Sequence, residues 1–374
     1  MYNRKSLLFI ATVFTFITLY LPQPLQPLLA ATYGKTPAQG SLLTSITLFP
    51  LALAPLLYGY ILGNIHPAKL LKIALIGLGI TNILFAIVTH FPSLILIRFI
   101  QGALIPILIT AIISLLLEEN PQGQRSLSLY VSLTILGGFS GRFLSTLFET
   151  YFTWENFSIL VGITLTILAF FLPNASTQES NVYQRPHWQD FLAIISHRTL
   201  LTILLIIYLS FGCFVALLNY LPFFIRKSDP QAGTLITGLM YSGYIIGAVV
   251  SIIAPKIIER FHVRPTLLTA NIAFISALIL LYSNNLWLTF SVLFLFCAAF
   301  FLTHTTAIAE INRCSPYPKA LTNAFYTSFY YTGAVIGVWL PGLIYQSFGK
   351  SIFITTLIAT TLCATVAIFT LPNE

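Results

Sequence analysis

Long apolar runs recur along the whole chain of 374 residues, and each is close to the length that crosses a bilayer. A helix that spans the hydrocarbon core needs about 20 predominantly apolar residues. Charged residues make up only 7% of the chain, far below the share in soluble domains, so we expect an all-α, multi-pass membrane protein. Twelve transmembrane helices are predicted, at 6–30, 40–63, 68–89, 92–117, 126–149, 155–172, 199–225, 232–258, 265–283, 286–309, 320–346 and 350–371.

The longest polar stretch between these runs is 173–198, which divides the predicted helices into six and six. We therefore expect an N-terminal six-helix bundle at 1–172, a cytoplasmic linker at 173–198 and a C-terminal six-helix bundle at 199–374. The division makes each bundle a unit that can be compared with the other.

The two halves repeat short motifs in the same order. Tyr20-Leu21-Pro22 closes the first predicted helix and Tyr220-Leu221-Pro222 closes the seventh. An offset of 196 relates one pair of glycines, Gly137 and Gly141, to another, Gly333 and Gly337. Two halves related by a parallel repeat are typical of transporters that bind substrate between the halves near the bilayer midplane.

Basic residues are distributed unequally between the two sides of the predicted membrane. An excess of lysine and arginine marks cytoplasmic segments. The segments on the side of both termini contain Arg4, Lys5, Lys69, Lys72, Arg125, Arg185, Arg198, Lys256, Arg260, Arg264, Arg313 and Lys319, and the other side contains Lys35, Arg226, Lys227 and Lys350. We expect both termini in the cytoplasm, and this asymmetry explains the net charge of +8 without a nucleic-acid partner.

Two helix motifs resemble those of a known family over essentially the whole chain. Helix four contains Arg98-Phe99-Ile100-Gln101-Gly102, which is similar to the R-x-x-Q-G element of the major facilitator superfamily. Helix five contains Gly137-Gly138-Phe139-Ser140-Gly141-Arg142 followed by Tyr151-Phe152-Thr153-Trp154, which resembles the bacterial inner-membrane YnfM-type branch, grouped with drug and arabinose efflux permeases. The resemblance implies two pseudo-symmetric bundles and transport by alternating access.

The cytoplasmic loop after helix two departs from the family pattern. The family places an aspartate and basic residues there as a latch between the halves, but residues 59–69 have neither that aspartate nor the arginine. The corresponding second-half segment keeps an acid and a base, Glu259 and Arg260. The resemblance therefore implies a gating role for Glu259 and Arg260, and a packing role for Gly102 and the four repeated glycines.

Ionisable residues inside a membrane are rare and usually face the bundle interior, so each is a functional candidate. Arg98 and Arg142 lie within the fourth and fifth predicted helices, with Gln101 one turn after Arg98. Glu149 follows Arg142 by seven residues, nearly two turns, and shares its helix face. We expect the side chain of Arg142 to run outward along the helix, toward pairing with Glu149 or toward the aqueous interface. The alternatives for Arg142 are a structural anchor and a direct contact with an anionic or strongly dipolar substrate.

The remaining candidates for substrate contact or coupling are His304, two glutamines and two tyrosines. Histidine titrates near neutral pH, so His304 is the best candidate for a proton-coupling group, with a packing role as the alternative. Gln23 and Gln26 lie among three prolines that bend the helix and free backbone carbonyls. Tyr326 and Tyr330 can line an apolar cavity or pack between helices.

The sequence shows no metal-ligand cluster, nucleophile and base pair or nucleotide-binding loop, and no cofactor is expected. Cys213, Cys297, Cys314 and Cys363 lack paired spacing and are expected to be free thiols. We expect a monomeric secondary transporter of the inner membrane that exports a small amphipathic or weakly polar molecule in exchange for protons. Nutrient uptake or facilitated diffusion is the alternative, and a membrane enzyme or a sensor on a transporter fold is a remote one.

Overall fold

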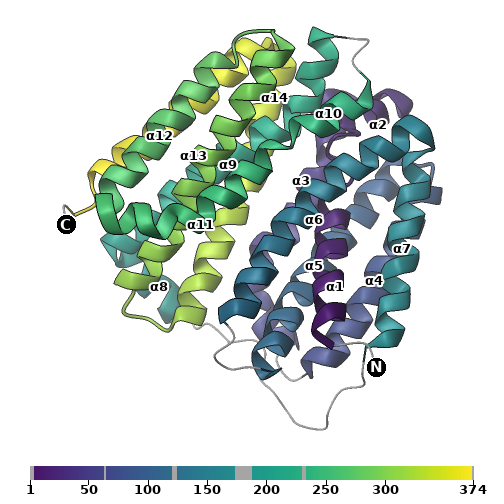
Figure 1. Cartoon of the computed structure of the whole chain (residues 1–374), viewed down its shortest axis with the longest axis horizontal. Helices are drawn as coiled ribbons and strands as arrows, with labels where there is room; N and C mark the ends of the chain where they lie inside the picture. Colours follow the sequence, from purple (N-terminus) through teal and green to yellow (C-terminus); the bar gives the residue numbers. More distant parts are fainter. Residues whose placement is uncertain (1–3, 63–64, 120–123, 173–187, 230–232, 373–374) are drawn as a thin grey trace.

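We describe the protein from a computed structural model, which places residues 4–62, 65–119, 124–172, 188–229 and 233–372. Within these ranges the chain is almost entirely α-helical and contains no β-strand. The helices form two groups, with the early helices (purple to teal) on one side of Figure 1 and the later helices (green to yellow) on the other. The predicted linker falls largely on 173–187, which lies outside the described residues.

The helices are, in chain order, α1 (Arg4–Tyr20), α2 (Gln26–Thr32), α3 (Pro37–Leu62), α4 (Pro67–Ile87), α5 (Phe91–Glu119), α6 (Gln124–Tyr151), α7 (Trp154–Phe171), α8 (Trp188–Ser196), α9 (Arg198–Ser228), α10 (Thr234–Met240), α11 (Gly243–Phe261), α12 (Val263–Leu280), α13 (Leu286–Cys314) and α14 (Lys319–Phe369).

Ten described segments are long and apolar enough to cross a membrane. One of them, Leu321–Phe369, has 49 residues and holds two spans, because the chain turns at Gly349. The φ of Gly349 is 78°, a left-handed conformation that glycine adopts without a steric penalty. The 17-residue α1, continued by α2, supplies the remaining span. The prediction of twelve transmembrane helices in two bundles is confirmed.

The first span is broken where the sequence places prolines. The chain leaves the helical path after Tyr20 and resumes it at Gln26. Pro22 has no N–H, so it cannot donate the usual hydrogen bond to the carbonyl four residues earlier, that of Thr18. The break therefore leaves carbonyl groups at the end of α1 available to other donors.

The repeated glycines create matching close contacts in the two halves. A Cβ on Gly137 would lie 2.6 Å from the carbonyl oxygen of Val13, and one on Gly141 would lie 2.7 Å from that of Ile17, so α1 packs directly on α6. In the second half, Gly333 meets the backbone of Tyr208 and Gly337 meets that of Gly212, so α14 packs on α9 in the same way.

Gly102 provides a third close helix contact within the first half. A Cβ on Gly102 would lie 2.5 Å from the carbonyl oxygen of Thr47, so side chains larger than hydrogen would push α5 away from α3. Small residues that bring two backbones together are a common device of membrane helix packing. The glycine motifs therefore allow close helix–helix contacts within each half.

Candidate functional site

A cavity of about 520 Å³ lies between the two halves. The first half contributes residues of α1, α5 and α6 to its lining, and the second half contributes residues of α9, α11, α13 and α14. Cavities of a few hundred cubic ångströms lined mostly by apolar and aromatic side chains are typical of sites for small molecules. Both halves therefore form one compartment of suitable size and chemistry.

Aromatic rings make up much of the second-half wall of this cavity. The rings of Phe211 and Tyr330 stack with centroids 3.4 Å apart, and those of Phe214 and Phe300 stack at 3.8 Å. Phe301 meets Phe300 edge to face at 5.4 Å. Stacked and edge-to-face rings hold one another in place. This wall is thus an ordered aromatic surface that suits a flat, apolar ligand.

His304 lies in the same wall, next to two of the predicted tyrosines. The hydroxyl of Tyr326 lies 2.9 Å from Nδ1 of His304, and the ring of Tyr330 lies 5.1 Å from the imidazole. All three residues line the cavity. The structure therefore brings His304, Tyr326 and Tyr330 together, although they come from α13 and α14.

Arg142 is buried at the edge of this cavity, where it joins the two halves. Its Nε donates to Oε1 of Gln23 at 2.6 Å, its Nη1 to the carbonyl of Gly138 at 2.8 Å, and its Nη2 to the hydroxyl of Tyr244 at 3.0 Å. The guanidinium carbon also lies 3.7 Å from the ring centroid of Tyr20. Arg142 thus connects α6 to the α1–α2 break and, across the interface, to α11.

The predicted pairing of Arg142 with Glu149 is wrong. Side chains on a helix lean toward its N-terminus, and Arg142 follows this rule by bonding Gly138, one turn earlier. Glu149 lies two turns in the opposite direction, where its Oε2 accepts a hydrogen bond from the backbone N–H of Trp154 at 3.0 Å. Glu149 therefore caps the start of α7 instead of neutralising Arg142.

Arg98 is held by the carbonyls that the break in α1 releases. Its Nη1 donates to the carbonyl of Thr18 at 2.9 Å and its Nη2 to that of Leu19 at 2.7 Å. Its Nε donates to the carbonyl of Leu43 at 2.7 Å, and Nη1 also bonds Oε1 of Gln101 at 2.6 Å. Arg98 and Gln101 therefore join α5 to α1 and α3 inside the first half.

Polar contacts between the halves gather at the end where α1 stops. Nε2 of Gln26 donates to Oδ1 of Asn219 at 2.7 Å, and the hydroxyls of Ser41 and Tyr220 lie 2.8 Å apart. At the same end, a Cβ on Gly238 would lie 3.0 Å from the Cβ of Thr146. We call this end, which contains α2 and α10 at the top of Figure 1, the closed end.

The family model of the Major Facilitator Superfamily matches residues 8–262 and again residues 228–374. The chain belongs to the major facilitator superfamily. It is a multi-pass membrane transporter, as this membership and the architecture of its two bundles indicate.

Other superfamily members resemble the chain over most of its length. An uncharacterized transporter of Buchnera aphidicola subsp. Baizongia pistaciae is 28% identical over 367 residues, which cover 94% of this chain and 89% of the relative. The inner membrane transport protein YnfM of Escherichia coli is 27% identical over 356 residues, covering 91% and 84%. The predicted resemblance to the superfamily, including YnfM, is confirmed.

Solved structures of superfamily transporters share the fold. The nucleoside transporter NupG superposes with a TM-score of 0.79 at 14% identity, covering 99% of this chain and 100% of that one. A bacterial homologue of the human lysosomal transporter Spinster, in an inward-facing conformation, gives a TM-score of 0.74 at 13% identity, covering 99% and 95%. At these identities the likeness establishes the superfamily fold alone.

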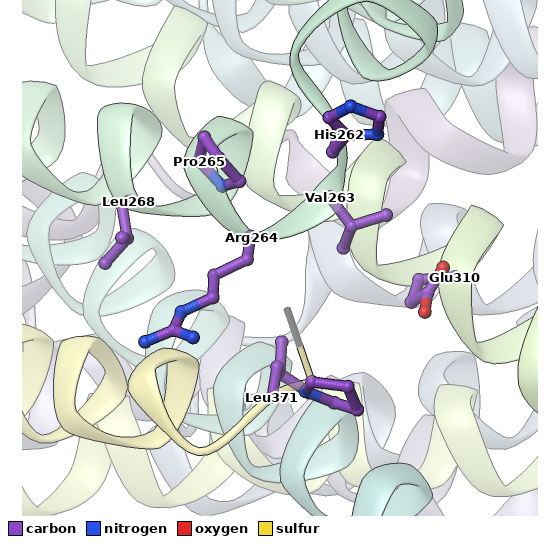
Figure 2. Close-up of a pocket in the computed structure, with 8 residues that line it drawn as sticks. His262, Val263, Arg264, Pro265, Leu268, Glu310 and Leu371 are labelled. Carbon is purple, nitrogen blue, oxygen red and sulfur yellow. The ribbon is translucent and has the colours of Figure 1, made fainter. Parts of the chain in front are cut away.

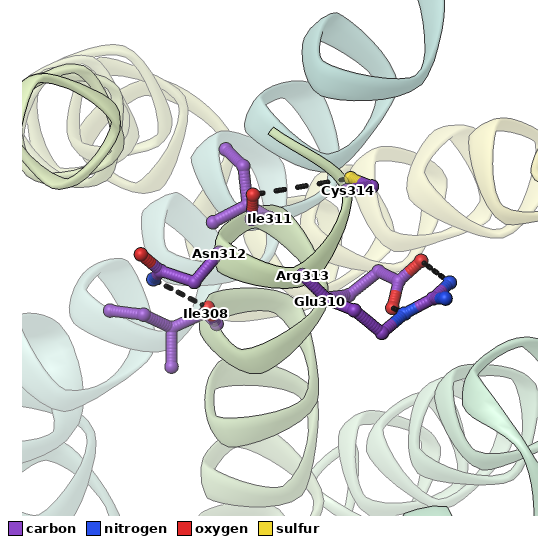
Figure 3. A network of polar contacts seen from close by, with 6 residues as sticks. All are labelled: Ile308, Glu310, Ile311, Asn312, Arg313 and Cys314. Atoms are coloured by element: carbon purple, nitrogen blue, oxygen red, sulfur yellow. Dashed lines mark hydrogen bonds and ion pairs between the residues drawn. The ribbon is translucent and has the colours of Figure 1, made fainter. Parts of the chain in front are cut away.

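Among the described residues of this superfamily member, the acid and base at the end of α11 make no contact that joins the halves in the present conformation. Glu259 and Arg260 are exposed, and Arg260 lies over the neighbouring ring of Phe261 at 5.4 Å. Their predicted latching role stays a prediction. By contrast, Arg313 and Glu310 form an ion pair at the end of α13, with two hydrogen bonds of 2.8 Å (Figure 3).

A second cavity, of about 350 Å³, lies at the corner between α11 and α12 (Figure 2). Its lining includes His262, Arg264, Glu310 and Leu371, which all belong to the second half. A substrate site in a superfamily transporter must be shared by both halves, so that their relative motion can change its access. The cavity between the halves is therefore the candidate site.

Sequence reasoning missed several residues that the fold brings to this region. Tyr241 and Tyr244 face Arg142 with ring centroids 5.0 Å and 4.5 Å from its guanidinium carbon, and Asn219 receives Gln26 across the interface. The repeated Tyr-Leu-Pro motif gave a signal near Asn219 alone, because Asn219 directly precedes Tyr220.

Proposed function

We propose that this transporter exports a small aromatic or amphipathic molecule through the cavity between its halves, in exchange for protons and by alternating access. The observation that supports the proposal most is the cavity itself, with aromatic walls from both halves and one histidine in its lining. One chain supplies both walls, which favours a monomer as the working unit. The proposal makes the protein a transporter instead of an enzyme or a sensor.

The present conformation fits one half of the proposed cycle. Contacts between Gln26 and Asn219, and between Ser41 and Tyr220, hold the closed end together. The cavity extends away from that end, along α6 to Tyr130 and along α13 to Ile308. If both termini are cytoplasmic, as the basic residues predict, this conformation faces the cytoplasm and can load a cytoplasmic molecule for export.

Opposite ends of α9 test the proposed orientation. Ser196, just before the helix, and Ser228, at its end, are both exposed. A helix of 31 residues is about 46 Å long and spans the bilayer. We expect a single cysteine placed by Ser228→Cys to react with an impermeant thiol reagent in intact cells, and one placed by Ser196→Cys to react only after permeabilisation. Labelling of position 196 in intact cells would contradict the orientation.

His304 is the proposed coupling group, because it lies in the cavity wall where substrate and proton can compete. Its Nδ1 is 2.9 Å from the hydroxyl of Tyr326, which can follow a change of protonation by donating or accepting. A proton carried by His304 in one conformation and released in the other would link transport to the pH gradient. Export by exchange then requires protonation from the outside.

Replacing His304 with glutamine should uncouple transport from pH. A gradient of one pH unit is worth 1.36 kcal/mol per proton and supports about tenfold accumulation. In liposomes we expect His304→Gln to lose this accumulation but to keep exchange at equal pH. Three small labelled aromatic probes are tried as cargo: benzenesulfonate (an anion), benzenesulfonamide (neutral) and benzyltrimethylammonium (a cation). The probe with the fastest protein-dependent flux is used. His90→Gln, at an exposed position, is the matched control.

The direction of the imposed gradient separates export from uptake. Export by exchange predicts accumulation in inside-out vesicles when their lumen is acidic, whereas symport predicts accumulation when their exterior is acidic. Accumulation that is unchanged in His304→Gln would show that the histidine packs the wall and that coupling lies elsewhere. The glycine-rich motif at 137–142, in α6, resembles that of efflux permeases, and this resemblance favours export.

A further inference from the structure

Two buried arginines give the cavity a positive electrostatic environment. Resting on the proposed function, we infer that the transported molecule carries an anionic group on an aromatic body, and that aromatic cations are rejected. Arg142 provides the charge that selects the anion. Arg98 adds to the field from inside the first half.

The balance of buried charge in the described residues carries this inference. The charged side chains that are buried there are Arg98, Arg142 and Glu310. Glu310 is paired with Arg313 at 2.8 Å and belongs to the far end of α13. Each of the two arginines has neutral acceptors in its contacts. The interior near the cavity therefore carries positive charge that no described carboxylate balances.

Arg142 and Arg98 differ in the number of N–H donors that remain for a ligand. A guanidinium has five N–H groups. Arg98 makes four hydrogen bonds, three of them to backbone carbonyls of α1 and α3, so its donors are used to hold these helices together. Arg142 makes three, one from each nitrogen, and its guanidinium also lies against Tyr20, so at most one N–H on Nη1 and one on Nη2 are available to a ligand. A guanidinium with N–H groups to spare on both Nη atoms can donate two hydrogen bonds to a carboxylate or sulfonate.

The position of Arg142 places its charge at the cavity wall. Three residues that touch it, Tyr20, Gly138 and Tyr244, line the cavity, while Arg142 itself lies behind them. Its guanidinium carbon lies 3.7 Å and 4.5 Å from the ring centroids of Tyr20 and Tyr244. Charge acts over such distances when the surroundings are apolar, so the field reaches the cavity before any contact forms.

Opening of the closed end would free one more N–H of Arg142. The hydrogen bond from Nη2 of Arg142 to Tyr244 crosses from the first half to the second, so it must break when the halves separate there. An anionic group can replace the tyrosine hydroxyl as the acceptor. Gln23 and Gly138 belong to the same half as Arg142 and keep its side chain in place throughout.

Three matched probes test charge selection on the purified protein. Benzenesulfonate is a permanent anion, benzenesulfonamide is its neutral analogue, and benzyltrimethylammonium is a cation of similar size. Binding stabilises a protein in proportion to the logarithm of ligand concentration over Kd, so thermal unfolding at several concentrations gives each affinity. We expect benzenesulfonate to bind at least about tenfold more tightly than the sulfonamide, a difference of about 1.4 kcal/mol, and the cation not to bind measurably.

Substitutions assign the preference to Arg142. We expect Arg142→Gln to weaken benzenesulfonate binding by about tenfold or more and to leave the sulfonamide affinity unchanged. Arg142→Lys, which keeps the charge but not the paired donors of the guanidinium, should recover part of the preference. Arg226→Gln removes an exposed cation at the closed end and serves as the control. If Arg142→Gln fails to fold, the ranking of the three probes on the native protein and on Arg142→Lys decides the matter.

The possible outcomes are distinct. Equal affinity for anion and neutral analogue, or tighter binding of the cation, would overturn charge selection while leaving the proposed transport through the cavity intact. Binding of none of the three probes would overturn the aromatic anion as the substrate class. A preference for the anion that survives in Arg142→Gln would show that Arg142 is not its source.

Discussion

Replacing Arg98 with alanine is expected to destabilise the protein by about 2–5 kcal/mol, because three hydrogen bonds to neighbouring helices are lost at about 0.6–1.7 kcal/mol each. Those bonds end on the carbonyls of Thr18, Leu19 and Leu43. Thr18 cannot recover a helical partner, since Pro22 has no N–H to donate. The loss should be visible as early unfolding when the purified protein is titrated with a denaturing detergent.

Two further variants determine whether the geometry of Arg98 causes the loss. Arg98→Lys keeps the charge but replaces the donors on three nitrogens with an ammonium whose three N–H groups share one atom, so we expect fewer of the carbonyls to be bonded and intermediate stability. Arg226→Ala removes an exposed arginine and should change stability little. If Arg98→Ala unfolded at the same detergent concentration as Arg226→Ala, the role of Arg98 as the tie between α1, α3 and α5 would be refuted.

The spans and the repeat could be predicted because they depend on local pattern. An apolar run of bilayer length can form little else than a helix, and matching motifs reveal the two halves. The three prolines after Tyr20 likewise predicted the break in α1. The ion pair of Glu310 and Arg313 was predictable too, since its partners lie three residues apart on one helix.

The partners of Arg142 could not be found in the same way. Gln23 and Tyr244 lie 119 and 102 residues away in sequence, so no helical spacing connects them to Arg142. The predicted partner, Glu149, satisfied the spacing rule, but the side chain of Arg142 leans in the opposite direction. Contacts between halves depend on how complete bundles dock, and a single sequence has no local signal for that.

A disulfide across the closed end is expected to abolish transport almost completely. Thr146 of α6 and Gly238 of α10 belong to different halves, and a Cβ on Gly238 would lie 3.0 Å from that of Thr146. Disulfides join Cβ atoms about 3.5–4.5 Å apart, so a small adjustment suffices. In a background without Cys213, Cys297, Cys314 and Cys363, we expect oxidised Thr146→Cys/Gly238→Cys to lose protein-dependent flux and to regain it on reduction.

A second cysteine pair provides the control for this lock. Ala30 of α2 and Gly40 of α3 lie at the same end but within one half, and a Cβ on Gly40 would lie 2.9 Å from that of Ala30. The disulfide of Ala30→Cys/Gly40→Cys has similar geometry and should leave transport intact, because it does not join the halves. Equal inhibition by both pairs would show that crosslinking at this end harms the protein for another reason.

Access to the cavity from each side of the membrane can be measured without knowing the substrate, and it tests directly whether one cavity opens alternately to the two sides. Thr134 is half-buried and lines the cavity. Alkylation is irreversible, so even a minor conformer is labelled in time. The test adds Thr134→Cys to the locking pair. Under reducing conditions we expect an impermeant reagent to reach the thiol at position 134 from either side of the membrane. After oxidation we expect it to reach that thiol only from the cytoplasmic side. Labelling of that thiol from a single side in the reduced protein, or from the outside in the oxidised protein, would contradict alternating access through this cavity.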